Sequence, residues 1–286
     1  MRALHSVTLT VVLAAALSAH VVEAQGAADR AKVLRTAADA LGMARWSDIG
    51  ANANTRLPGI DIVNTMELQG SGTTDLAGRP VKTDFHIALG YNPVAARVEL
   101  TRTPDAGAAQ HTIQTVRDTY AWNESEMGAG LIPGKGVATP AMTAVRERLL
   151  HIWMLPYGVV KAAYAAGDKA VVSTEAGATT ISAPLTGPLA GITVKATLDA
   201  NNLMTKVEAR ADNQALANLN WEADYSNYAD HAEVLTDVKT PGHLVLKQGG
   251  RTVVDLTVKT WETNNPYLVF PIPPNVKSAP ATTTSR

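Results

Sequence analysis

Residues 81–89 read Val81-Lys82-Thr83-Asp84-Phe85-His86-Ile87-Ala88-Leu89, and side chains suited to a core alternate in them with polar ones. Such alternation places one set of side chains on each face of a β-strand, and a strand with one buried and one wet face is typical of antiparallel sheets. Gly90-Tyr91-Asn92-Pro93 then reads as a turn, and the alternation resumes from Val94 to Leu100. This region therefore predicts two strands of an antiparallel meander.

Further strands are expected on both sides of this pair. The first begins at Ile60 and is followed by a turn-rich stretch from Gly70 to Pro80. Asn201-Asn202 and Gly249-Gly250 predict tight hairpin turns, since both pairs tolerate positive φ. The remaining strands are expected at residues 112–116, 119–123, 170–174, 179–183, 191–199, 203–210, 219–225, 243–248 and 251–261.

Helical patterns occur at two places. Residues 29–41 carry an apolar stripe at helical spacing and predict a helix at the start of the domain. Between the two groups of strands, a long glycine-rich loop precedes Thr139 and Pro140, which suit the cap and first position of a helix. Pro156 is expected to end or kink that helix, and residues 157–166 to form a second one.

These elements predict a mainly antiparallel β protein with a few helices, of the α+β class. A sheet of about ten strands or more tends to curl, so we expect a half-barrel covered on its concave face by the central helical insertion. Residues 25–277 are expected to form this single domain, although Pro271-Ile272-Pro273-Pro274 cannot lie inside a sheet. Residues 278–286 are expected to form a disordered tail.

The first residues predict export from the cell. A basic start at Arg2, an apolar run from Val7 to Leu17 and a small residue at Ala24 match a signal peptide over residues 1–24. The run is shorter than the ~20 residues that span a bilayer, and no later segment is long and apolar enough. We therefore expect a periplasmic or secreted protein without a transmembrane segment after signal cleavage.

Charge and cysteine content exclude several classes of function. Lys+Arg 25 against Asp+Glu 26 leaves a net charge of −1, which offers no electrostatic surface for nucleic acid. Cysteine is absent, so disulfides and thiol catalysis are both excluded. Nucleic acid is accordingly not among the expected partners.

No catalytic, cofactor or metal motif emerges from the sequence. The glycine-rich residues 128–136 depart from a phosphate-binding loop, because Ala129 stands at the first required glycine and Gly136 replaces the Ser or Thr after Lys135. The histidines are scattered without metal-ligand spacing, and no Gly-x-Ser-x-Gly elbow occurs. We expect no cofactor, no metal and no catalytic residues, which favours a protein that is not an enzyme without deciding the matter.

The densest polar cluster leaves one catalytic alternative open. Asp224, Asp230 and His231 lie within eight residues and could perform acid–base chemistry if they met at one atom. The ordinary interpretation is a strand end followed by an aspartate-rich turn.

Aromatic and aliphatic residues near the insertion are the candidate ligand contacts. A helix that covers the concave face would line it with side chains spaced three and four residues apart. Aromatic side chains also dominate cores, so packing is their commoner role. The candidates are Trp122, Val145, Leu149, Ile152, Trp153 and Tyr157.

Several separated segments resemble a known family. They are Arg97–Arg102, Asp118–Asn123, Arg148–Gly158, Asn202–Glu208, Tyr225–Tyr228 and Lys247–Arg251. In this order they resemble the β-rich N-terminal region found ahead of the hydrolase domain in some secreted bacterial metallo-β-lactamase-fold proteins. The resemblance spans Leu34 to Asn275. The zinc signature His-x-His-x-Asp-His is missing from this chain, so hydrolase activity is not implied.

A second resemblance concerns pattern more than letters. The strand-helix-strand order, the Asp118 turn leading to Trp122, and the closing Phe270-Pro271-Ile272-Pro273-Pro274 resemble the periplasmic carriers of outer-membrane lipoproteins. That family folds as an open half-barrel covered by helices and shelters acyl chains, which implies a similar fold and ligand here.

The sequence thus supports two main hypotheses. The first is an exported, non-catalytic carrier for a lipid or other hydrophobic ligand. The second is an interaction module that docks on a separate protein partner, such as a metallo-hydrolase. Which ligand, which partner and which oligomeric state apply is left open.

Overall fold

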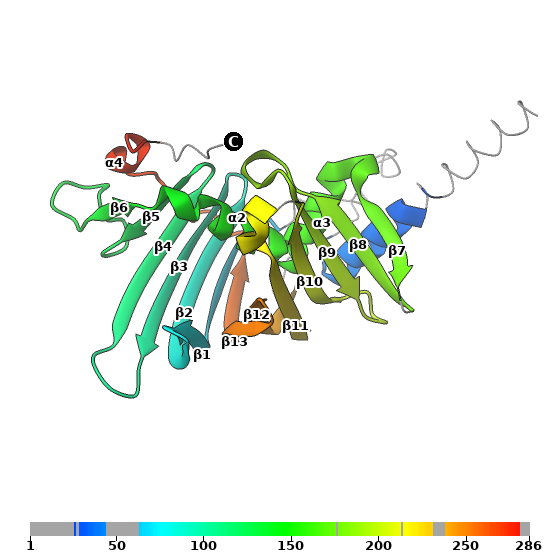
Figure 1. Ribbon diagram of the computed structural model, residues 1–286, viewed down its shortest axis with the longest axis horizontal. Helices are drawn as coiled ribbons and strands as arrows, with labels where there is room; N and C mark the ends of the chain where they lie inside the picture. The colour runs from blue at the N-terminus through cyan, green and yellow to red at the C-terminus, as the bar shows by residue number, and fades with distance from the viewer. Residues whose placement is uncertain are drawn as a thin grey trace, which may run out of the picture.

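A single antiparallel sheet of 13 strands dominates the computed structural model (Figure 1). The structure describes Gly26 and residues 29–43, 63–175, 177–212, 214–230 and 238–280. The strands of its first half are β1 (Thr65–Leu76), β2 (Arg79–Tyr91), β3 (Val94–Thr103), β4 (Gln110–Arg117), β5 (Tyr120–Glu124) and β6 (Ala138–Pro140). Those of the second are β7 (Val171–Glu175), β8 (Ala178–Pro184), β9 (Ile192–Leu198), β10 (Met204–Ala211), β11 (Trp221–Asp230), β12 (Lys239–Gln248) and β13 (Arg251–Thr263).

Two meanders joined edge to edge build this sheet. Its order is β6-β5-β4-β3-β2-β1-β13-β12-β11-β10-β9-β8-β7, so the first and last strands of the chain pair at the centre. The outer strands β6 and β7 are consecutive in sequence and lie at opposite ends of an open sheet. The segment that joins them must therefore cross the sheet. The predicted α+β class and open, curved antiparallel sheet are confirmed.

The crossing segment is the helical insertion, formed by α2 (Val145–Met154) and α3 (Pro156–Ala166). Figure 1 shows both helices between the two halves of the sheet. Pro156 is the first residue of α3, where its missing N–H costs nothing. The expected start of α2 was wrong: Pro140 pairs with Trp122 in the short strand β6, and the helix begins only at Val145. Pairing with the edge of the sheet outweighs the local capping signal of residues 139 and 140.

The expected turn-rich stretch from Gly70 to Pro80 is also wrong in its first part. β1 continues through Leu76, and the turn is confined to the next two residues. Gly70 lies at a register shift between β1 and β13, where a Cβ atom would stand 2.0 Å from the Thr257 carbonyl oxygen. Glycine is needed there because the neighbouring backbone approaches too closely for any side chain.

The chain ends pack against different faces of the sheet. Residues 29–40 are helical as expected, and the Lys239 amide donates to the Leu41 carbonyl oxygen (3.1 Å). The closing segment places Phe270 beside Ala88 and Ala95, and ends in α4 (Pro274–Lys277). Residues 1–24, Ile60 and the last six residues of the predicted tail lie outside the described part of the chain.

Candidate functional site

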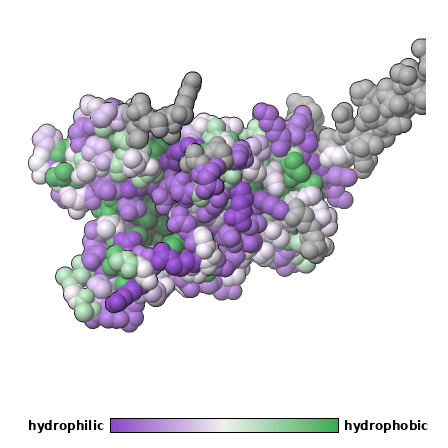
Figure 2. Space-filling view, in the orientation of Figure 1, coloured by the Kyte–Doolittle hydropathy of each residue, from purple (hydrophilic) through white to green (hydrophobic). Residues whose placement is uncertain are grey.

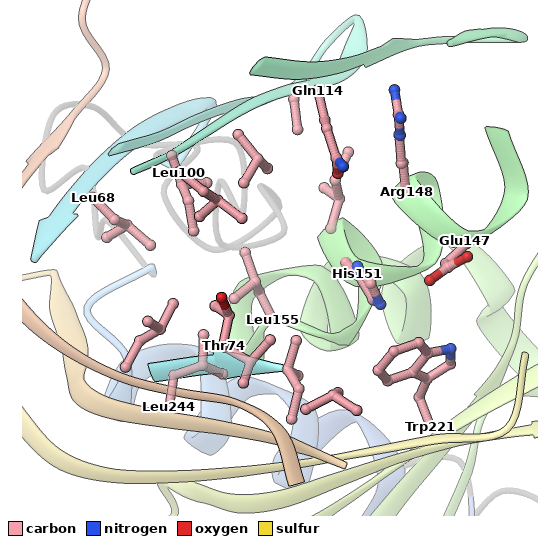
Figure 3. A pocket seen from close by; sticks show the side chains of 18 of the residues that line it. Leu68, Thr74, Leu100, Gln114, Glu147, Arg148, His151, Leu155, Trp221 and Leu244 are labelled. Atoms are coloured by element: carbon pink, nitrogen blue, oxygen red, sulfur yellow. The ribbon is translucent and has the colours of Figure 1, made fainter. Parts of the chain in front are cut away.

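A cavity of about 420 Å³ lies between the inner face of the sheet and helix α2. Figure 3 shows the side chains that surround it, and Figure 2 shows hydrophobic surface inside a hollow of this face. The volume falls within the range of roughly 300–1,000 Å³ that small-molecule sites occupy. Most of the wall is aliphatic, including Leu68, Ile87, Leu100, Leu155, Leu244 and Leu256.

The alternation of the strands explains why these side chains face the cavity. On β3, Ala96, Val98 and Leu100 line it, whereas Arg97 and Glu99 between them point to the outer face. The partners of Ala96 across the neighbouring strands also line it, because directly opposed residues share a face of the sheet. The inner face is thus an aliphatic surface that runs across several strands.

Glycine adds to the space inside. Gly70 and Gly72 pair with Val258 and Leu256, and therefore lie in the inner-facing phase of β1 between Leu68 and Thr74. Neither glycine projects a side chain into the hollow. Strand β13 approaches so closely that only glycine fits at these two positions. As a result, no side chain projects into the cavity from the middle of β1.

Hydrogen bonds to its backbone anchor helix α2 over the cavity. The Tyr91 and Tyr225 hydroxyls donate to the carbonyl oxygens of Ile152 (3.4 Å) and Met154 (2.9 Å). At the other end, Arg148 donates to the carbonyl oxygens of Thr115 (2.9 Å) and Trp122 (2.7 Å). Burial raises the pKa of both tyrosines, so the phenols stay protonated and remain donors. Helix α2 is thus anchored at both ends, and the cavity between it and the sheet is not filled by side chains.

Two polar side chains of the wall, His151 and Trp221, lie in contact with each other. The rings of His151 and Trp221 meet edge to face, with centroids 4.7 Å apart and an interplanar angle of 87°. Burial lowers the pKa of His151 to about 4, so its imidazole is neutral at pH 7. His151 Nε2 and Trp221 Nε1 are buried without a hydrogen-bond partner in the described chain. Unpaired buried groups cost about 1–3 kcal/mol each, which makes this corner of the wall a place for a polar atom of a ligand or for water.

The mouth of the cavity is charged. Arg102 Nε donates to Thr74 Oγ1 (2.9 Å), and one terminal nitrogen donates to Thr112 Oγ1 (3.2 Å). Arg251 lies 3.3 Å from the Asp75 carboxylate at the same rim. Burial lowers the pKa of Arg102. The lining thus carries three arginines, at 102, 148 and 251, against two carboxylates, at 75 and 147.

Of the six candidate ligand contacts, Ile152 lines the cavity. Trp122 lies on the outer face, where it packs with Ala138 and Val276 and its Nε1 donates to Glu124 (2.8 Å). Thr115 lies directly opposite Trp122 on the neighbouring strand and also hydrogen-bonds to Glu124. Directly opposed residues share a face of the sheet, so the Trp122 side chain points away from the cavity.

The other four candidates belong to the packing of the helices. Trp153 contacts the Tyr91 ring edge to face at 6.0 Å, and the Tyr157 hydroxyl donates to the Lys239 carbonyl oxygen (2.6 Å). Val145 and Leu149 are buried in the main core. None of these four is part of the cavity wall, and a binding role for any of the six stays a prediction. The lining residues that were missed were visible in the sequence as the inward phase of β3 and its neighbours.

The structure does not bring together the residues of the acid–base alternative. Asp224 and Asp230 lie six positions apart on β11, which separates them by about 20 Å at ~3.3 Å per residue. Asp224 also forms an ion pair with Lys247 on the outer face. Two carboxylates at this distance cannot serve one substrate atom. His231 lies outside the described residues.

A serine, a histidine and an aspartate do meet on the outer face. His243 Nδ1 lies 3.3 Å from Ser226 Oγ, and His243 Nε2 lies 2.7 Å from Asp255 Oδ1. The three are cross-strand neighbours on β11, β12 and β13, on the side of the sheet opposite the cavity. This arrangement resembles the polar ladder of a solvated sheet face, which is how we interpret it.

Within the described residues, no three His, Cys, Asp or Glu side chains are grouped closely enough to hold a metal ion. The same residues include no helix with the length and apolarity required to cross a membrane.

Comparison with known proteins gives structural matches alone. No family model and no curated protein matches this chain. A domain described as an outer membrane lipoprotein-sorting protein from Vibrio parahaemolyticus matches with a TM-score of 0.41 and 10% identity, over 71% of this chain and 86% of that one. A DUF1329 family protein from Desulfovibrio piger matches with a TM-score of 0.42 and 7% identity, over 83% of this chain and 91% of that one.

The two structures show no more than a similar fold. Neither structure supports the resemblance to metallo-β-lactamase-fold proteins, which stays a prediction. Both TM-scores are below 0.5, so neither structure carries a function over to this chain.

Proposed function

We propose that this chain is an exported, non-catalytic binding or carrier protein of the cell envelope, and that it holds the apolar part of a lipid or other hydrophobic molecule in the cavity beneath α2. The observation that carries the proposal is an aliphatic hollow of about 420 Å³ that the protein's own side chains leave open. Apolar surface that stays unfilled costs stability unless something occupies it.

Burial of an acyl chain supplies enough free energy for such a function. Each methylene that leaves water contributes about 0.8 kcal/mol. A chain of about ten methylenes therefore contributes roughly 8 kcal/mol, before the loss of translational and conformational freedom is subtracted. No catalytic group is required for this kind of binding.

A bulky side chain in the cavity tests the proposal. Val98 lines the hollow, and Thr101 on the same strand faces outward beside His111. We expect Val98→Trp to weaken binding of a fluorescent fatty acid by about tenfold or more, because the indole takes the space of several methylenes. Thr101→Trp, the matched control, leaves binding unchanged. Equal binding by the two variants, both shown to be folded by circular dichroism, would overturn the proposal.

The native ligand is sought by mass spectrometry under non-denaturing conditions after mild extraction from cells. A mass above that of the chain, lost in organic solvent, supports a bound hydrophobic molecule. The same preparation tests export, since N-terminal sequencing should begin at Gln25 if residues 1–24 are removed. A mature chain that still begins at Met1 would contradict the export part of the proposal.

The alternative, an interaction module that docks on a separate partner enzyme, is favoured by one observation. The loop after β5 exposes Met127, Ile132 and Val137 by 48%, 60% and 65%. Apolar side chains that form one contiguous exposed patch are typical of contact surfaces. Crosslinking from this loop in the periplasm tests the alternative: a protein partner that is lost in an Ile132→Asp variant supports it, and a chain that stays monomeric argues against it.

A further inference from the structure

We infer that the ligand of the cavity has an anionic head group, a carboxylate or a phosphate, which Arg102 binds at the mouth while the apolar chain lies inside. This inference rests on the proposed function, and it names the chemical class of the ligand.

Arg102 is placed at the junction between apolar wall and open mouth. It follows Leu100 by two positions on β3, so both side chains lie on the cavity side of the sheet. A molecule whose chain contacts Leu100 therefore has its end within reach of the guanidinium. Amphiphiles have this shape, with an apolar chain and one polar end.

The hydrogen bonds of Arg102 orient it without neutralising it. Its two bonds go to the hydroxyls of Thr74 and Thr112, which are neutral. No carboxylate of the described residues forms an ion pair with it, whereas Arg97, Arg210 and Arg251 each have at least one such partner. A guanidinium has five N–H donors, so donors remain for a ligand.

A partly desolvated cation with neutral partners is well suited to an anion. Burial lowers the pKa of Arg102, which shows that its charged form is less stabilised than in water. A carboxylate or phosphate accepts two parallel hydrogen bonds from one guanidinium, and such charged pairs are stronger than neutral ones. Cholines and other cations would be repelled at the same place.

The carboxylates at the mouth do not cancel this preference. Asp75 is paired with Arg251 and also accepts the Gly78 amide (3.2 Å). Glu147, on α2, interacts with the neighbouring Arg148. Asp75 therefore has a positive partner of its own, and no ion pair joins Asp75 or Glu147 to Arg102 in the described residues.

The test compares four ligands with a twelve-carbon chain on the full protein by isothermal titration calorimetry: dodecanoate, dodecyl phosphate, dodecanol and dodecyltrimethylammonium. We expect one or both anions to bind about 10- to 100-fold more tightly than dodecanol, as expected for hydrogen bonds to a charged group. A preference between the two anions identifies carboxylate or phosphate as the head group. The ammonium ligand should bind most weakly.

Arg102→Gln removes the charge and keeps an amide donor for Thr74. We expect it to bind all three neutral and anionic ligands with the affinity of dodecanol. Arg210→Gln is the matched control, because Arg210 is exposed and paired with Glu208 and Glu222 on another strand pair; it should keep the preference for anions.

The outcomes separate this inference from the proposed function. Equal affinity of the wild-type chain for dodecanol and both anions would overturn the anionic head group and leave hydrophobic binding in place. An anion preference that persists in a folded Arg102→Gln variant would also overturn it. Absence of binding by all four ligands would overturn both proposals. The wild-type series tests the preference for an anionic head group even if Arg102→Gln does not fold.

Discussion

Strand β3 carries an arginine on each face of the sheet, and the surroundings of the two differ. Arg97, on the outer face, is 8% exposed, lies 3.6 Å from the Glu124 carboxylate and stands over the Phe270 ring at 5.8 Å. Arg102, on the inner face, has two threonine hydroxyls as partners and borders an open cavity.

The segments that cover the two faces account for this difference. On the outer face of β2 and β3, the extended closing segment of the chain packs on the strands around Ala88 and Ala95, where it buries Phe270. The inner face is covered by helices anchored at their ends to tyrosines and Arg148. A rigid helix cannot follow a curved sheet as an extended chain can, so it leaves space beneath it. Three predictions test whether one face is filled and the other hollow.

The largest effect is expected from Glu124 on the filled face. Its carboxylate accepts hydrogen bonds from Thr115 Oγ1 (2.8 Å), Trp122 Nε1 (2.8 Å) and the Gly128 amide (2.7 Å), and pairs with Arg97. Glu124→Ala leaves a buried cation and several donors unpaired, so we expect a loss of about 3–5 kcal/mol in the free energy of unfolding.

Urea denaturation measures this loss, with the exposed Glu126→Ala as control. A loss below about 1 kcal/mol, the value typical of surface ion pairs, would show that the outer face is not filled as described.

A smaller effect is expected from His151 in the cavity wall. Its folded-state pKa of about 4 lies below the unfolded value of about 6.5. The unfolded chain therefore binds the proton more readily, and stability must fall as the pH decreases from about 6.5 to about 4. The shift corresponds to roughly 3 kcal/mol over this window.

His151→Phe keeps an aromatic edge against Trp221 and removes the titration. Urea unfolding of both proteins at pH 7 and pH 4 isolates the contribution of this residue, because all other groups cancel in the difference. The same dependence on pH in variant and wild type would place His151 in contact with water rather than in a closed wall.

The smallest effect compares a residue of the hollow with a residue of the solid core. Leu150 on α2 is fully buried, and Leu100 lines the cavity. Leu→Ala costs about 2–5 kcal/mol, and more where a new void is created in tight packing. We expect Leu150→Ala to be about 1–2 kcal/mol more destabilising than Leu100→Ala. Thermal unfolding of the two variants checks this, and an equal loss would indicate that the inner face is packed throughout.

Much of the fold could be predicted because the signals are local. The alternation in β2 and β3 predicted both strands, and the hairpin turns fall where Asn202, Gly249 and Gly250 have positive φ. The errors arose where a local signal was ambiguous. Gly70 resembled a turn residue, although a neighbouring backbone requires it inside β1, and Pro140 resembled a helix start, although it pairs with Trp122.

The candidate site was harder to predict than the strands. Trp122 was predicted as a ligand contact because it is aromatic, but its side chain lies with Thr115 and Glu124 on the outer face. Arg102 was not among the predicted contacts, because its role depends on Thr74 and Thr112 on other strands and on the absence of an ion-paired carboxylate among the described residues. The residue types predicted binding of a hydrophobic ligand. Which residues line the cavity depends on the face of the sheet to which each strand position points.

Sequence alone was sufficient for the class of fold, most strands and the alternation of their faces, because a period of two is a property of neighbouring residues. Tertiary structure decided that β1 meets β13, that the insertion spans the inner face, and that a cavity remains under α2. These depend on contacts between residues far apart in the chain and on the balance between side-chain volume and enclosed space. No local pattern contains that balance, because it exists only after the strands have paired and the helices have closed over them.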